Sequence, residues 1–216
     1  MKPRLVTFEG IEGCGKSAVS REALLALERA GVNAVLVREP GGTAVSERIR
    51  ELLLDPERRE IAPLTELMLY LSARSQLVSE VIRPALADGR TVLCDRYIDA
   101  SVAYQGFARG LGERFVERLN RVAAEGAVPD RTFLLDVPVV EGLARGPLRR
   151  ERDGVARRDR LEREDLAFHE RVREGYLRLA RRNRSRVVVV VASRPLEDVV
   201  SAVLGNLERL FSVSLI

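Results

Sequence analysis

The chain has 216 residues, of which 46% are hydrophobic and 31% charged, and its formal net charge is +4. This length fits one α/β domain, and no apolar run approaches the roughly 20 residues that span a bilayer. Two cysteines, Cys14 and Cys94, are too few for a disulfide scaffold, and the positive charge is too small to require a nucleic-acid partner. The first ten residues contain no secretory signal, so we expect a cytoplasmic protein that does not enter a membrane.

Short apolar runs alternate with longer stretches of helical period, a pattern typical of a parallel sheet connected by helices. Five runs predict strands, at residues 4–9, 33–38, 91–95, 132–137 and 186–192. Seven stretches predict helices, at residues 16–30, 44–54, 63–87, 113–125, 139 to about 150, 164–182 and 195–210. The last strand, RVVVVVA, has no polar alternation, so we expect both of its faces to be covered. Gly31, Gly89 and Gly126 lie where C-terminal helix caps belong.

A phosphate-binding pattern follows the first predicted strand. Gly10, Gly15, Lys16 and Ser17 fit the pattern G-x-x-x-x-G-K-[ST], with a strand before it and a helix after it. Glycines allow successive backbone N–H groups to face a phosphate at the positive end of a helix. Lys16 is then expected to reach the β- and γ-phosphates, and the Ser17 hydroxyl to bind Mg²⁺. The loop residues predicted to bind ATP are Gly10, Ile11, Glu12, Gly13, Cys14, Gly15, Lys16 and Ser17.

Regulatory GTPases, motor ATPases and small-molecule kinases share this loop, so other segments must distinguish them. The sequence contains no N-K-x-D motif for reading guanine. The third predicted strand instead ends in Asp95-Arg96-Tyr97. Asp95 is placed to hold Mg²⁺ directly or through water, and Arg96 supplies positive charge for a second phosphate. This pair suits transfer between two phosphorylated molecules, although a surface ion pair is the alternative interpretation.

Five motifs occur in order along the chain: FEGIEGCGKS, REPGGT (38–43), DRY (95–97), SVAYQG (101–106) and DRLE (159–162). With them the sequence closely resembles bacterial thymidylate kinases. The resemblance implies a three-layer α/β/α P-loop kinase fold with a five-stranded parallel sheet, in a single domain covering residues 1–216. It also implies ATP and Mg²⁺, dTMP as acceptor in dTTP biosynthesis, dTDP and ADP as products, and a homodimer.

Residue roles carry over from this resemblance position by position. Arg38 and Arg96 match residues that hold the acceptor phosphate, and Glu12 matches one near the 3′-hydroxyl of dTMP and near Arg96. Tyr70 matches an aromatic residue over the thymine, and Arg74 one that donates to its O4. Ser101 and Gln105 match residues near the polar edge of the base, and Tyr104 matches a residue under the deoxyribose. Core packing for Tyr70, and loop packing for residues 101–105, are the alternative interpretations.

The region 145–163 carries many arginines, and three interpretations of it remain open: a solvated helical face, an RNA-binding arm, or a lid that closes on ATP. The resemblance favours the lid. Members of the family that it resembles carry the arginine that neutralises charge during transfer either in the phosphate loop or in the lid. The loop of this chain contains no arginine, so the resemblance implies that the lid supplies it. The predicted catalytic residues are Lys16, Arg96 and, as candidates within the lid, Arg149, Arg150, Arg152 and Arg158. His169, the single histidine, is assigned no catalytic role.

Three rival functions remain at this point. The nearest is a kinase for another mononucleotide or for a deoxynucleoside. A regulatory P-loop NTPase that switches partners, and a nucleic-acid-binding module built on the arginine run, are the other two.

Overall fold

A computed structural model describes residues 2–145, 149–150, 156–157 and 159–215. The five predicted strands are confirmed and form one parallel sheet in the order β2-β3-β1-β4-β7. Their bounds are β1 (Leu5–Glu9), β2 (Ala34–Arg38), β3 (Thr91–Asp95), β4 (Arg131–Asp136) and β7 (Val187–Val191). All five residues of β1 are buried, since this strand lies at the centre of the sheet. Phe8 of β1 stacks on Phe133 of β4 with ring centroids 5.7 Å apart.

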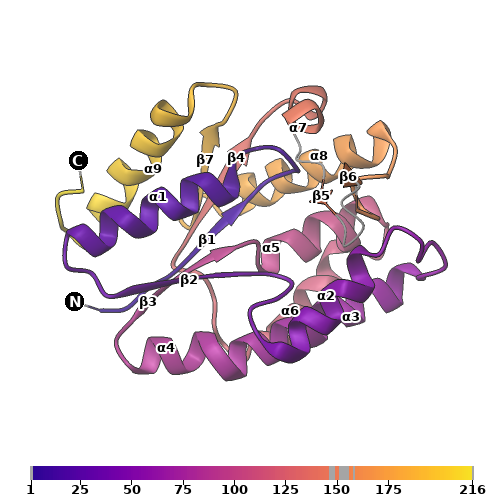
Figure 1. Cartoon of the computed structure of the whole chain (residues 1–216), viewed down its shortest axis with the longest axis horizontal. Coiled ribbons are helices and arrows are strands. Elements are labelled where there is room, and N and C mark those ends of the chain that lie inside the picture. The colour runs from indigo at the N-terminus through magenta and orange to yellow at the C-terminus, as the bar shows by residue number, and fades with distance from the viewer. Residues whose placement is uncertain (1, 146–148, 151–155, 158, 216) are drawn as a thin grey trace.

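Helices cover both faces of the sheet (Figure 1). One face carries α1 (Lys16–Arg29) and α9 (Leu196–Phe211), which lie side by side. The other elements with helical structure are α2 (Ala44–Leu54), α3 (Pro63–Leu77), η1 (Val78–Ile82), α4 (Arg83–Ala87), α5 (Ile98–Ser101), η2 (Val102–Ala108), α6 (Glu113–Ala123), α7 (Val139–Arg145) and α8 (Leu166–Arg182). Of these, α4 and α8 pack on the sheet, and α3, α5, η2 and α6 pack around them. The predicted three-layer α/β/α fold is confirmed.

The predicted helix 63–87 is continuous, but it changes from α to π geometry at η1. Within this turn Arg83 donates its backbone N–H to the carbonyl of Val78, five residues earlier. Pro84 follows immediately and has no N–H to donate, so the regular α-helical ladder is broken at this point in any case. Gly89 ends the helix with a φ of 78°, as its capping position predicted.

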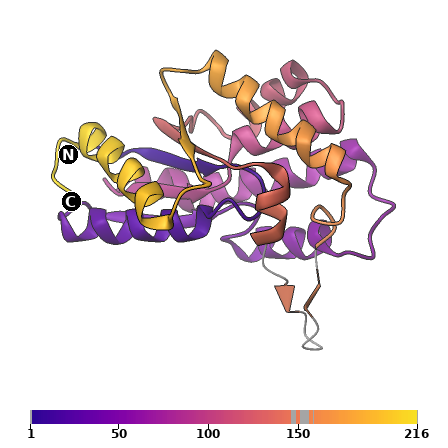
Figure 2. The ribbon, with the colours of Figure 1, turned by 90° about the horizontal axis from the view of Figure 1, so that it is seen from above.

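Two expectations about the elements are wrong. The helix predicted to reach about residue 150 ends at Arg145, before the sequence Gly146-Pro147, and residues 149–150 instead form β5, paired antiparallel with β6 (Ala156–Arg157). Figure 2 shows both short strands lying beside the three layers. Only one face of the edge strand β7 is well covered, because Val189 and Val191, which share the other face, are 45% and 51% exposed. Residues 98–108, for which no element was predicted, form α5 and η2.

The order of the strands determines where a ligand site lies. The chain leaves β1 toward α1 on one face of the sheet and leaves the neighbouring β3 toward α5 and η2 on the other face. Parallel sheets bind ligands in the crevice that such a reversal opens at the carboxyl ends of the strands. Glu9, Arg38 and Asp95 are the last residues of β1, β2 and β3 and therefore lie at this edge. No helix in the described part of the chain is long and apolar enough to cross a bilayer.

Candidate active site

The phosphate loop connects β1 to α1. Gly10, Gly13 and Gly15 have φ values of 139°, 70° and 93°, a region that favours glycine. At Gly10 space is also limiting, because a Cβ atom would lie 2.5 Å from the carbonyl oxygen of Leu135. The residue at the start of α1 is Gly15, which has no side chain to cap the helix. The first N–H groups of α1 therefore remain available for an anion at the positive end of the helix dipole.

Lys16, Ser17 and Asp95 meet beside this loop. The Lys16 side chain bends back over the loop, and its Nζ donates to the Ile11 carbonyl at 2.8 Å. The Ser17 hydroxyl donates to Oδ2 of Asp95 at 2.6 Å, and both residues line the same cavity. A hydroxyl and one carboxylate are hard oxygen ligands of the kind that hold Mg²⁺ together with nucleotide phosphates. The residues present therefore fit the predicted metal.

Arg96 occupies the left-handed region, with a φ of 66°, which is rare for a residue with a side chain. Its Nη1 donates to the Gly10 carbonyl at 2.9 Å, and its Nη2 lies 3.4 Å from Oε2 of Glu12. The guanidinium also lies over the Tyr104 ring, 5.2 Å from the ring centroid. These contacts hold Arg96 with its side chain still 19% exposed to the cavity. Strained backbone of this kind is concentrated at functional sites.

A second layer lies behind Arg96. The Tyr176 hydroxyl donates to Oε2 of Glu9 at 2.8 Å and accepts from Nη1 of Arg96 at 3.3 Å. Glu9 is fully buried, and its Oε1 accepts the backbone N–H of Tyr97 at 2.7 Å. Burial and the nearby Asp99 raise the pKa of Glu9 to about 8, although Arg96 and the two hydrogen bonds oppose the shift. The Tyr176 hydroxyl thus connects the ionisable Glu9 to Arg96, the cation that faces the cavity.

One cavity of about 660 Å³ connects these groups. The loop, the strand ends, α3, η2 and residues 159–162, near the end of the arginine-rich region, all contribute to its wall. This volume fits a ligand of nucleotide size. The lining residues are Glu12, Gly13, Gly15, Lys16, Ser17, Ala18, Arg38, Glu39, Pro40, Arg50, Leu54, Tyr70, Asp95, Arg96, Ala100, Ser101, Tyr104, Gln105, Arg145, Asp159, Leu161, Glu162 and His169.

Comparison with known proteins decides the family, because the thymidylate kinase profile matches residues 8–203. The chain belongs to the thymidylate kinase family. It is 49% identical to the thymidylate kinase of Desulfosudis oleivorans, over 94% of this chain and 96% of the relative. The thymidylate kinase of Trichlorobacter lovleyi is 47% identical, over 92% of this chain and 93% of the relative. The crystal structure of thymidylate kinase from Ehrlichia chaffeensis aligns with a TM-score of 0.75 and 32% identity, covering 96% and 99% of the two chains.

The family predicted from the five motifs is therefore confirmed, and with it an enzyme that phosphorylates dTMP. The structure brings twelve of the predicted site residues into one cavity wall. They are Glu12, Gly13, Gly15, Lys16, Ser17, Arg38, Tyr70, Asp95, Arg96, Ser101, Tyr104 and Gln105. Gly10, Ile11, Cys14 and Arg74 do not line the cavity. Gly10, Ile11 and Cys14 form the inner side of the loop, where Ile11 and Cys14 are buried in the core.

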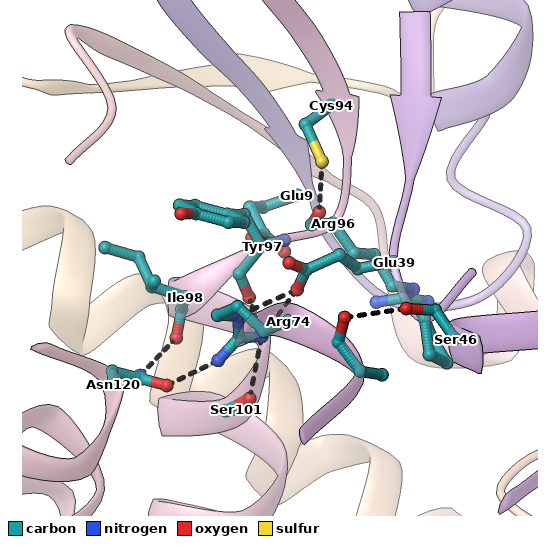
Figure 3. A network of polar contacts seen from close by, with 12 residues as sticks. Glu9, Glu39, Ser46, Arg74, Cys94, Arg96, Tyr97, Ile98, Ser101 and Asn120 are labelled. Carbon is teal, nitrogen blue, oxygen red and sulfur yellow. Dashed lines mark hydrogen bonds and ion pairs between the residues drawn. The ribbon is translucent and has the colours of Figure 1, made fainter. Parts of the chain in front are cut away.

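Arg74, the predicted contact of the thymine O4, is 1% exposed and lies behind the cavity wall. Figure 3 shows it at the centre of a polar network. Its Nε donates to Glu39 at 2.8 Å, its Nη1 to Asn120, and its Nη2 to the Tyr97 carbonyl and the Ser101 hydroxyl, both at 3.0 Å. In this structure Arg74 therefore supports Ser101, which does line the cavity.

Arg38 lines the cavity beside the cis peptide between Glu39 and Pro40. Its Nη2 lies 2.8 and 2.9 Å from the two carboxylate oxygens of Glu47 on α2. Oε1 of Glu47 also accepts the N–H of Gly42 at 2.8 Å. Glu47 thus orients Arg38, which is predicted to bind the acceptor phosphate, and at the same time closes the REPGGT turn.

Sequence reasoning missed several residues of the cavity wall. Asp159, Leu161 and Glu162 belong to the DRLE motif, which was recognised without roles for these three positions. Arg50 and His169 give no local signal, since each lies on an ordinary amphipathic helix. Both reach the site only because α2 and α8 pack beside it.

The candidate lid arginines are not tested by the structure. The backbone at Arg149 and Arg150 forms β5. Their side chains, and Arg152 and Arg158 altogether, lie outside the described residues. Arg145, at the end of α7, is described and lines the cavity, with its Nη1 donating to the Ala192 carbonyl at 2.9 Å.

Proposed function

We propose that this chain transfers the γ-phosphoryl group of ATP to the 5′-phosphate of dTMP in the described cavity, with Lys16 and Arg96 as catalytic residues. The observation that carries the proposal is the placement of Lys16 and Arg96 on one cavity wall. Lys16 begins α1, after the loop that leaves β1, and Arg96 directly follows the neighbouring strand β3. The phosphate loop by itself explains the binding of ATP. A second cation directed into the same space accounts for a phosphorylated acceptor.

The nucleophile is an anionic phosphate oxygen, so the reaction needs no strong general base. The catalytic work of the protein is alignment and charge neutralisation in a site with little water. Lys16 binds the β- and γ-phosphates, and Arg96 holds the acceptor phosphate in line. Ser17 and Asp95 would hold Mg²⁺, which when bound neutralises the charge on the ATP phosphates. Glu12 accepts a hydrogen bond from the 3′-hydroxyl of dTMP. Its partner Arg96 offsets the repulsion between the Glu12 carboxylate and the nucleotide phosphates.

Base recognition is assigned to the wall opposite the phosphate loop. Tyr70 stacks on thymine, Ser101 and Gln105 bond its polar edge, and Tyr104 lies under the deoxyribose. Tyr104 is 6% exposed, and its ring is held edge-on by Phe168 and Tyr176 with centroids 6.2 Å away in both cases. A ring fixed in this way leaves little room for a 2′-hydroxyl. Arg38 completes the acceptor site at the phosphate end.

Residues 145–163 are assigned to a lid that closes on ATP and supplies one arginine, and two chains are assigned to a homodimer. Leu64 and Met68 on α3 support the dimer, since they are four residues apart on one helical face and are 46% and 43% exposed. Light scattering after gel filtration tests this assignment, and a monomer at micromolar concentration would contradict it.

The function is tested by measuring ADP formation from ATP and Mg²⁺ with dTMP, dUMP, UMP, dCMP, dGMP and AMP offered separately. We expect dTMP to give the highest kcat/KM. Slow ATP hydrolysis that no monophosphate accelerates would contradict the proposal and favour a regulatory NTPase. A Ser17→Ala variant should need more Mg²⁺ for half-maximal activity while its KM for dTMP stays unchanged.

A further inference from the structure

Gln105 lies in the π-helical turn η2, is 1% exposed and lines the cavity. Its Nε2 donates to Oε1 of Glu66 at 2.8 Å. Glu66 is fully buried on α3 and does not line the cavity. The carboxamide of Gln105 is therefore held from behind by a group that a ligand does not contact.

The other donors that the structure describes around Glu66 are themselves fixed in place. Nη2 of Arg109 lies 3.1 Å from Oε2 of Glu66, and Nη1 of Arg160 lies 2.7 Å from the same oxygen. Arg109 is further fixed by Glu164, at 2.6 Å, and Arg160 by the Leu53 carbonyl, at 2.9 Å. A carboxylate paired with two guanidinium groups presents acceptor atoms alone.

This arrangement determines which end of the Gln105 amide meets a ligand. A carboxamide has a donor end and an acceptor end, and the two are interchanged by a rotation of about 180°. Because Glu66 offers no proton, only the NH₂ end of Gln105 can face it. The carbonyl oxygen Oε1 is then the end that remains to accept a hydrogen bond at the cavity wall.

Thymine and cytosine differ in the groups that such an oxygen can meet. Thymine carries an N–H donor at N3, whereas N3 of cytosine is an acceptor. We propose that Glu66 is a positioning residue that fixes the Gln105 carbonyl toward the acceptor base and thereby selects thymine over cytosine. This inference rests on the proposed function, which places the base beside Gln105. A site with a fixed buried acceptor rejects a base that leaves it unpaired much more strongly than a site whose amide can turn.

The test compares kcat/KM for dTMP and dCMP in Glu66→Gln and wild type. The substituted side chain carries both a donor and an acceptor, so Gln105 can turn and offer its NH₂ group to N3 of cytosine. We expect the ratio of kcat/KM values, dTMP over dCMP, to fall by at least about tenfold. An unchanged ratio in a folded Glu66→Gln enzyme would overturn the inference.

Two further variants separate selectivity from stability. Arg109→Gln removes an ion pair from the same carboxylate but leaves the bond between Glu66 and Gln105, so its ratio should match wild type. Glu66→Asp shortens the side chain and remains a pure acceptor, so its ratio should stay above that of Glu66→Gln even where stability falls. An equal loss of selectivity in Arg109→Gln would show that any destabilisation of this ion-pair network lowers selectivity, and it would contradict the inference. A wild-type enzyme without preference for dTMP would instead contradict the proposed function.

Discussion

Tyr176 and Glu9 are 167 positions apart in the sequence, yet the Tyr176 hydroxyl donates to Oε2 of Glu9 at 2.8 Å. The same hydroxyl lies 3.3 Å from Nη1 of Arg96. Arg96 adopts a left-handed backbone conformation, which persists only where surrounding contacts hold the residue in place, and this hydroxyl is one of those contacts. A residue of α8 thus connects a buried acid at the end of β1 to the cation proposed to hold the acceptor.

We predict that Tyr176→Phe raises the KM for dTMP by about tenfold or more while the KM for ATP changes little. The variant leaves the buried Glu9 carboxyl group without one hydrogen-bond partner, a loss of ~1–3 kcal/mol, and removes a support of Arg96. Steady-state kinetics with each substrate varied in turn measure both constants.

The matched control is Tyr97→Phe. The Tyr97 hydroxyl is also buried and donates to the Ala127 carbonyl at 3.0 Å, away from the cavity. This variant should lower the free energy of unfolding by a similar amount without changing the KM for dTMP. Equal kinetic effects in the two variants would show that Tyr176 acts through stability alone.

Glu9 gives the stability of the protein a defined pH dependence. Its pKa is raised from the ordinary value of 4.5 to about 8, mainly by burial. Between these values the folded chain keeps a proton that the unfolded chain releases, so the free energy of unfolding falls as pH rises through this window and levels off above about pH 8. One such group contributes a slope of at most about 1.4 kcal/mol per pH unit.

We predict that Glu9→Gln flattens this slope between pH 5 and 8. Urea unfolding at half-unit pH intervals measures it. Burial also raises the pKa of Glu39, although Arg74 opposes the shift, so Glu39 contributes with the same sign and some slope will remain. A Glu9→Gln slope identical to that of wild type would show that Glu9 is ionised in the folded state throughout this range.

The sequence was sufficient to predict the sheet and the phosphate loop because both are encoded locally. Runs of β-branched residues mark the strands, and the glycine-lysine-serine pattern needs only a strand before it and a helix after it. The fully buried β1 and the positive φ values of the loop glycines agree with these predictions.

The parts that were not predicted depend on residues brought together by packing. The bonds from Gln105 to Glu66 and from Tyr176 to Glu9 connect separate helices and strands, and nothing near either residue indicates its partner. The π-helical turns depend on one extra residue per turn, which leaves no periodic signal. Arg74 lies on α3, and its burial depends on its pairing with Glu39, which directly follows β2 and is distant from Arg74 in the sequence.

Burial changes what we expect of Arg74. The Arg74→Ala change would leave Glu39, 5% exposed, without its guanidinium partner. We predict a loss of about 3–5 kcal/mol in the free energy of unfolding, since an uncompensated buried charge is strongly destabilising. A raised KM for dTMP should accompany it, because Ser101 also loses a donor.

Urea unfolding and kinetics on the same sample test this pair of effects. The exposed ion pair between Arg48 and Glu51 provides the comparison, and Arg48→Ala should change stability by less than about 1 kcal/mol. An Arg74→Ala enzyme with wild-type stability and a raised KM for dTMP would contradict the supporting role. That result would favour the original prediction that Arg74 contacts the base directly.

The last prediction concerns the close approach of the phosphate loop to β4. Gly10 combines a φ of 139° with a backbone neighbour, since a Cβ atom would lie 2.5 Å from the Leu135 carbonyl oxygen and 2.7 Å from the Cys14 sulfur. Gly89 has a φ of 78° but open space around the position of a Cβ atom, and it lies away from the cavity.

Gly89→Ala therefore meets only the left-handed backbone penalty of about 1–2 kcal/mol. Gly10→Ala must in addition displace a carbonyl of β4 or the loop, so we predict a larger loss of stability together with loss of ATP binding. Thermal unfolding with and without ATP measures both, and a Gly10→Ala protein as stable as Gly89→Ala, with an intact shift on ATP addition, would show that the loop does not need this close approach.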